Sequence, residues 1–187
     1  CGGEGALNGT DGRALGVRGV KDADVTGGGV SGDGGGIYLD AANASGDVSI
    51  TVTGDMNGGR GDAFDTGHNY AETLYLKIDG NVVSEDGIRA RTDGTGTATV
   101  IIGGDLTNTS IRSSSGILAA GYADDRHATA VEGTNQNGTI TGGNGGIETQ
   151  AYGAGSARIT VNNVDVGWGT SGVVARHHGT GSNYVTS

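Results

Sequence analysis

Residues 85–110 read EDGIRARTDGTGTATVIIGGDLTNTS, and this stretch decides the fold. It has Gly87-Ile88 near its start and then passes through a turn rich in Gly and Thr. An alternating segment follows and ends at a Gly-Gly-Asp turn, with Leu106 directly after it. Alternation of apolar and polar side chains is typical of a β-strand with one buried face. The stretch therefore predicts strand, turn, strand and turn within 26 residues.

The same pattern recurs along most of the chain. Each copy begins with a small residue and then an apolar one, and these apolar residues are Ile37, Phe64, Ile88, Ile117, Ile147 and Val173. They lie 27, 24, 29, 30 and 26 residues apart. Alternating segments and small turns such as Gly-Asp, Gly-Asn or Asn-Asn follow in the same order, with one degraded copy around residues 127–132. The chain is therefore expected to be built from structural repeats.

A repeat of 24–30 residues with about three short strands predicts one coil of a parallel β-helix. Stacked coils lie about 4.8 Å apart, the ordinary spacing of strands. The 41 glycines suit sharp corners. The absence of proline suits a wall in which most backbone N–H groups donate to a neighbouring coil. An antiparallel sandwich or up-and-down barrel would explain the density of strands, but not a period shared by three landmarks.

We therefore predict an all-β chain that forms a parallel β-helix, or β-solenoid, of roughly six coils. The solenoid is expected over residues 34–187, as part of a longer solenoid. Residues 1–33 fit the period poorly and are expected to form an irregular coil or a cap-like segment. Aromatic residues are scarce, so the core is expected to be narrow and aliphatic.

The charge of the chain excludes some partners. Eleven Lys and Arg stand against 21 Asp and Glu, which gives a net charge of −10. This balance argues against nucleic acid and against an anionic membrane surface as partners.

No apolar run approaches the ~20 residues that span a bilayer. The single cysteine, Cys1, precludes an internal disulfide; a lipid-modified terminus, a fragment start and an introduced residue stay as alternatives for it.

The order Gly-Ile, Gly/Thr-rich turn, Val-x-Val, and Gly-Asp-Leu or Gly-Asn-Val resembles the passenger repeats of bacterial autotransporters and related β-helical surface adhesins. The resemblance covers roughly residues 34–187. It implies a right-handed β-helical stalk outside a Gram-negative cell that acts in adhesion, aggregation or biofilm formation. A passenger excerpt, a secreted relative and another β-solenoid stay as alternatives.

One candidate binding loop is Arg60-Gly61-Asp62, within GGRGDAF between two predicted coils. Integrins read such a tripeptide through one cation and one carboxylate held at a fixed separation. A turn flanked by glycine would expose it. The alternative is a chance triplet in a sequence rich in Gly and Asp.

A second candidate is the carboxylate pair Asp124-Asp125, in one of the longest coils. Paired carboxylates serve acid–base chemistry when one raises the pKa of the other. The pair faintly resembles that of β-helical polygalacturonases, but the accompanying motifs do not match. A solvated loop is the favoured interpretation.

We expect neither a metal centre nor a cofactor. The histidines lack a metal-ligand spacing, and they are His68, His127, His177 and His178. Incidental calcium is compatible with acidic turns at Asp22, Asp24 and Asp33, but no tandem calcium-binding repeat follows Gly2-Gly3-Glu4-Gly5.

The sequence thus favours a non-enzymatic extracellular stalk or adhesin that binds host-surface or glycan ligands or associates with itself. The alternative is a β-helical lyase or hydrolase of acidic polysaccharide. Such an enzyme usually lines its groove with basic residues, and no concentrated basic stripe is visible along this sequence.

Overall fold

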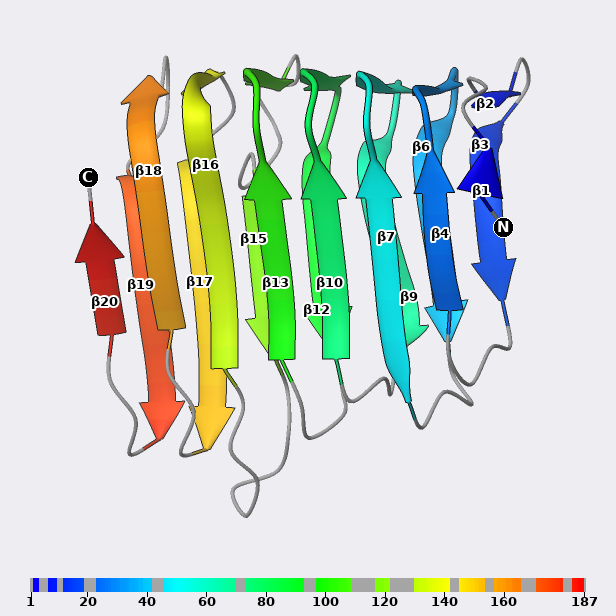
Figure 1. The fold of residues 1–187 in the computed structure, drawn as a ribbon. Helices are drawn as coiled ribbons and strands as arrows, with labels where there is room; N and C mark the ends of the chain where they lie inside the picture. The colour runs from blue at the N-terminus through cyan, green and yellow to red at the C-terminus, as the bar shows by residue number, and fades with distance from the viewer. Residues whose placement is uncertain are drawn as a thin grey trace.

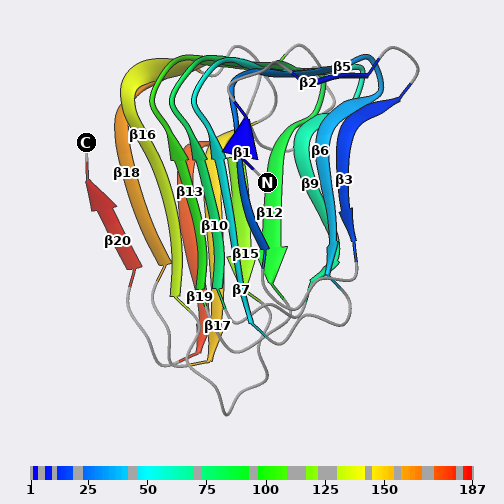
Figure 2. The same ribbon diagram turned by 45° about the vertical axis from the view of Figure 1, so that its right-hand side comes forward.

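The computed structural model describes residues 2–3, 7–9, 12–18, 23–41, 46–69, 73–92, 97–108, 117–121, 130–141, 145–153, 157–165, 171–179 and 183–186. Every regular element among them is a β-strand. The strands pair in parallel and form a β-helix with three faces (Figures 1 and 2). The predicted fold class is confirmed.

The first face lies in front in Figure 1, and its strands run upward. It consists of β1 (Gly2–Gly3), β4 (Ala23–Gly27), β7 (Asp47–Val52), β10 (Thr73–Ile78), β13 (Thr97–Ile102), β16 (Ala130–Thr141), β18 (Ala157–Asp165) and β20 (Asn183–Thr186). The second face is short and crosses the top, as Figure 2 shows. It consists of β2 (Leu7–Gly9), β5 (Val30–Gly32), β8 (Met56–Gly59), β11 (Val82–Ser84) and β14 (Leu106–Asn108). Because β16 and β18 continue round the corner onto it, the first two faces form one 13-stranded sheet.

The third face lies behind the first, and its strands run downward (Figure 1). It consists of β3 (Arg13–Arg18), β6 (Gly35–Ala41), β9 (Asp62–Asn69), β12 (Gly87–Thr92), β15 (Ile117–Gly121), β17 (Gly145–Gly153) and β19 (Ser171–Gly179). The chain rises along the first face, crosses the top and descends along the third face while it advances from right to left in Figure 1. This winding is right-handed, as the resemblance implies.

The register of the third face matches the sequence repeat. The apolar residues that open the repeats lie beside one another on consecutive strands, in the order Ile37, Phe64, Ile88, Ile117, Ile147 and Val173. On the first face the degraded copy is β16, whose Val131 lies between Ala98 of β13 and Ala157 of β18. The predicted coil period is therefore confirmed.

Strands also occur within the predicted N-terminal segment. β1, β2 and β3 pair in parallel with β4, β5 and β6 of the next coil. The boundary proposed at residue 33 falls between β5 and β6, and it stays a prediction.

The core runs along the axis as stacked rows of aliphatic side chains. On the first face these rows are Val48, Leu74 and Ala98, then Ile50, Leu76 and Val100, and then Val52, Ile78 and Ile102. The second face adds Val30, Met56, Val82 and Leu106. All are at most 3% exposed. Alternation along each strand therefore seals the interior, and it turns the polar side chains outward.

The corner between the first and second faces is built from stacked glycines and a side-chain ladder. Asp55 Oδ1 accepts a hydrogen bond from the Asn81 N–H at 2.8 Å, and Asn81 Oδ1 accepts one from the Asp105 N–H at 2.9 Å. Each bond joins one coil to the next. Gly80 directly precedes Asn81, and Gly104 directly precedes Asp105. Both glycines leave room for the ladder, because a Cβ at either position would lie within 2.8 Å of a backbone oxygen and of a side-chain oxygen in the preceding coil.

Candidate functional site

The tripeptide Arg60-Gly61-Asp62 forms the corner between β8 and β9. Arg60 is exposed, while Asp62 is half-buried at the start of β9. Gly59 precedes them with a φ of 55°, a conformation that favours glycine. The Arg60 side chain therefore leaves the corner toward solvent, whereas the Oδ1 atom of Asp62 is buried.

Backbone hydrogen bonds hold this corner to the coils on both sides. The Arg60 N–H donates to the Asp33 carbonyl at 2.9 Å, and the Gly61 carbonyl accepts from the Asp86 N–H at 3.3 Å. The Glu85 N–H donates to the Gly59 carbonyl at 3.0 Å. The tripeptide is thus part of the wall, with Asp33, Glu85 and Asp86 as acidic neighbours. Its recognition by an integrin stays a prediction.

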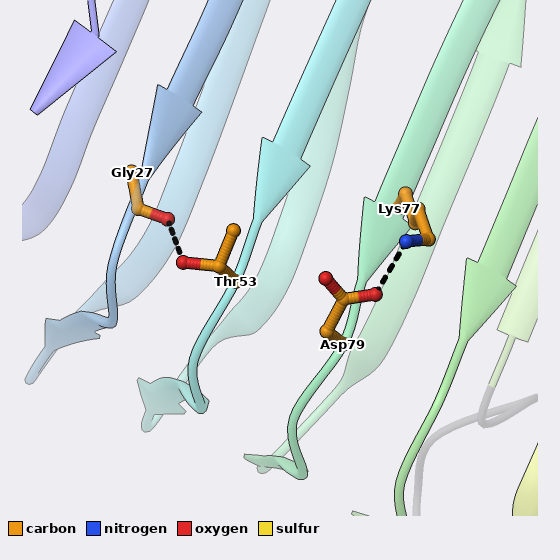
Figure 3. Close-up of polar contacts among 4 residues, drawn as sticks. All are labelled: Gly27, Thr53, Lys77 and Asp79. Carbon is orange, nitrogen blue, oxygen red and sulfur yellow. Dashed lines mark hydrogen bonds and ion pairs between the residues drawn. The ribbon is translucent and has the colours of Figure 1, made fainter. Parts of the chain in front are cut away.

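On the first face, outward polar side chains bond along and across the strands (Figure 3). Lys77 Nζ lies 2.6 Å from Asp79 Oδ1. This hydrogen bond, together with the charge of Asp79, raises the pKa of Lys77. At the end of β7 the Thr53 hydroxyl donates to the Gly27 carbonyl of the preceding coil at 3.1 Å. These two contacts tie polar side chains of the first face to its own wall.

The third face carries a different set of outward side chains. Tyr38, Asp65 and Arg89 lie beside one another on β6, β9 and β12. Asp40 and Arg91 follow two residues later on their strands, beyond the buried Leu39 and Ala90. We call these five residues the third-face patch: Tyr38, Asp40, Asp65, Arg89 and Arg91. Arg89 is exposed, the other four are half-buried, and the Nε atom of Arg91 is buried. The patch spans three neighbouring coils, and Arg89 is its most exposed member.

The third-face strands hold a large share of the cations of this acidic chain. Five of the 11 Lys and Arg residues lie in third-face strands, and they are Arg13, Arg18, Arg89, Arg91 and Arg176. Only four of the 21 acidic residues do so, and they are Asp40, Asp62, Asp65 and Glu148. The rest of the chain therefore has six cations against 17 acids. The sequence alone did not reveal this asymmetry, because the cations are spread from residue 13 to residue 176 and share a face only through the stacking of the coils.

The other predicted residues are scattered. His68 lies in β9, while His177 and His178 are adjacent in β19. Asp24 is exposed in β4, and Asp33 is exposed at the corner before β6. Residues Cys1, Asp22, Asp124, Asp125 and His127 lie outside the described residues. Within the described ranges, no three His, Cys, Asp or Glu residues are grouped to hold a metal ion.

The described part of the chain contains no helix long and apolar enough to cross a membrane. Comparison with protein-family models, curated proteins and solved structures finds no match. The class that the fold defines is the parallel β-solenoid, and function must be argued from its surface.

Proposed function

We propose that this chain is a non-enzymatic segment of an extracellular stalk or adhesin displayed on a bacterial surface. The observation that supports the proposal most is the register of the coils. Inward rows are apolar and sealed, and outward positions of the strands from β6 to β13 present Ser, Thr, Tyr and charged side chains. Such a wall offers an extended surface on which the same contact with a ligand can recur from coil to coil.

The repeat provides a physical basis for adhesion. Neighbouring coils present equivalent outward positions about 4.8 Å apart along the axis. A polymer or a cell surface can therefore meet several positions at once, and linked weak contacts raise the overall affinity. The fitting partners are host-surface or glycan ligands, or further copies of the chain. A net charge of −10 disfavours nucleic acid as a partner.

The proposal is tested by displaying the chain on beads and measuring bead aggregation, binding to host cells and binding to a glycan array. We expect binding in at least one assay, and we expect it to survive Asp62→Glu if the surface acts as a whole. The matched control is Asp86→Glu, because Asp86 occupies the same corner one coil later. Loss of host-cell binding in the Asp62 variant alone would instead identify the tripeptide as the binding loop.

Enzymatic activity is tested on the same preparation. Polygalacturonate is incubated with the chain, and new reducing ends and unsaturated products are measured. We expect neither product. Turnover would contradict the proposal and favour the lyase or hydrolase alternative. The absence of binding in all three assays would contradict the adhesive function.

A further inference from the structure

We infer that the third-face patch binds an acidic polysaccharide, a polymer that carries carboxylate or sulfate groups. The inference rests on the proposed adhesive function and specifies its ligand and its face. It starts from the charge asymmetry, because third-face strands hold five cations and four acids in a chain that elsewhere has six and 17. An anionic polymer that approaches this chain meets the least repulsion at the third face.

Arg89, with the half-buried Arg91 beside it, is placed to bind an anionic group. Arg89 and Arg91 lie on one strand with the fully buried Ala90 between them, so both leave the same side of β12. Two residues along a strand span about 7 Å. A guanidinium group presents a planar fork of N–H donors that matches carboxylate and sulfate oxygens, and such charge-assisted bonds are stronger than neutral ones. Arg89 is the more exposed of the two and makes the principal contact.

A third arginine extends the site along the axis. The register places Arg91 beside Ala120, Ala120 beside Gln150, and Gln150 beside Arg176. Three coil steps amount to about 14 Å. Arg176 is exposed like Arg89. A polymer that lies along the axis can therefore place anionic groups at both ends of this row.

The remaining members of the patch favour a sugar polymer over a bare polyanion. Tyr38 lies beside Asp65, and Asp65 beside Arg89. An outward tyrosine ring offers an apolar face with a polar tip, which suits the C–H face and the hydroxyl groups of a sugar. Asp40 and Asp65 provide acceptors for sugar hydroxyls, which a bare polyanion lacks.

The first test measures binding to polygalacturonate, dextran sulfate and neutral dextran by biolayer interferometry. Arg89→Gln is expected to weaken binding about ten- to hundredfold, the loss of a hydrogen bond between charged groups. The matched control is Lys77→Gln, which removes the same charge from the first face and is expected to leave binding unchanged. Arg89→Lys keeps the charge without the fork, so it is expected to fall between the two. Melting temperatures establish that each variant is folded.

Binding to polygalacturonate alone would identify carboxylate as the group recognised, and binding to dextran sulfate alone would identify sulfate. Equal losses in Arg89→Gln and Lys77→Gln would overturn the inference, as would equal binding to neutral dextran. Bead aggregation or cell binding without binding to either anionic polymer would overturn the polysaccharide inference and leave the adhesive function standing. The absence of binding in every assay would overturn both the inference and the adhesive function.

Discussion

At the scale of single residues, glycine decides how closely successive coils approach. A Cβ on Gly80 would lie 2.6 Å from the carbonyl carbon of Gly54 and 2.5 Å from Asp55 Oδ1. Atoms of the preceding coil therefore occupy the space that any side chain would need. The outward Gly16 in β3 has no such neighbour, because nothing lies within 4 Å of its Cβ position. The two glycines differ in their surroundings and not in their chemistry.

We predict that Gly80→Ala lowers the free energy of unfolding by about 1–3 kcal/mol, the usual cost of overpacking. The clash involves the Gly54 backbone as well as the Asp55 side chain, and backbone moves less readily than a side chain. Gly16→Ala serves as the control and is expected to be neutral or to stabilise the protein by up to ~1 kcal/mol, because alanine restricts the unfolded chain. Urea denaturation followed by circular dichroism measures both. Equal effects of the two substitutions would contradict the stacking argument.

The ion pair of Lys77 gives a prediction about pH. Its raised pKa means that the folded state favours the protonated amine, owing to the hydrogen bond and charge of Asp79. The stabilising contribution is therefore complete below the ordinary lysine pKa and disappears as the pH rises through the raised value. We expect an NMR titration of the Lys77 side chain to show the raised pKa, and Asp79→Asn to lower it. An identical titration in the variant would show that Asp79 is not the cause.

At the scale of elements, β9 and β12 show how the wall tolerates an irregular register. The pairing shifts by one residue between Gly87 and Ile88, so that Phe64 lies beside Ile88. Beyond this irregularity the buried Thr66 joins the strands through its side chain. Its hydroxyl accepts a hydrogen bond from the Arg91 N–H at 2.9 Å and donates to the Arg89 carbonyl at 3.5 Å. A polar residue in the apolar row thus completes the strand ladder beneath the third-face patch.

We predict that Thr66→Val lowers the free energy of unfolding by about 1–3 kcal/mol, because the isosteric side chain leaves the Arg91 N–H without its acceptor. The control is Thr51→Val on the outward side of β7, which is expected to change stability by less than ~0.5 kcal/mol. Hydrogen exchange provides a local readout, since the Arg91 amide is expected to lose protection in the Thr66 variant only. Retained protection would show that the hydroxyl is dispensable.

At the scale of the whole molecule, the charge of the solenoid opposes its compact form. A net charge of −10 is spread over a wall in which neighbouring coils are a strand spacing apart. The third face is the exception, because its cations and acids nearly balance. Self-repulsion is therefore expected to concentrate in the rest of the chain.

We predict that the melting temperature rises between about 10 mM and about 150 mM NaCl, since the Debye length falls from about 30 Å to about 8 Å and screens this repulsion. Differential scanning calorimetry measures the change. Potassium chloride at the same concentrations serves as the control and is expected to act equally, because screening depends on ionic strength. A falling melting temperature would show that ion pairs such as Lys77–Asp79 outweigh the repulsion.

The sequence by itself determined the strands, their corners and the period of the solenoid. These are local signals, because alternation marks which side chains are buried and glycine-rich turns mark where the chain bends. The spacing from Ile37 to Val173 was enough to predict which apolar residues stack. The Arg60-Gly61-Asp62 tripeptide was equally visible, although its hydrogen bonds to neighbouring coils were not.

Only the tertiary structure decided how far the outward side chains reach solvent and which polar groups bond between coils. Tyr38, Asp65 and Arg89 each directly follow an apolar residue that opens a repeat, so the period by itself implies that they are neighbours. The structure adds that Arg89 is exposed while Tyr38 and Asp65 are half-buried, and that the Thr66 hydroxyl joins β9 to β12. The physical reason is that the hydrophobic pattern sets the register, whereas exposure and side-chain hydrogen bonds depend on how neighbouring coils pack.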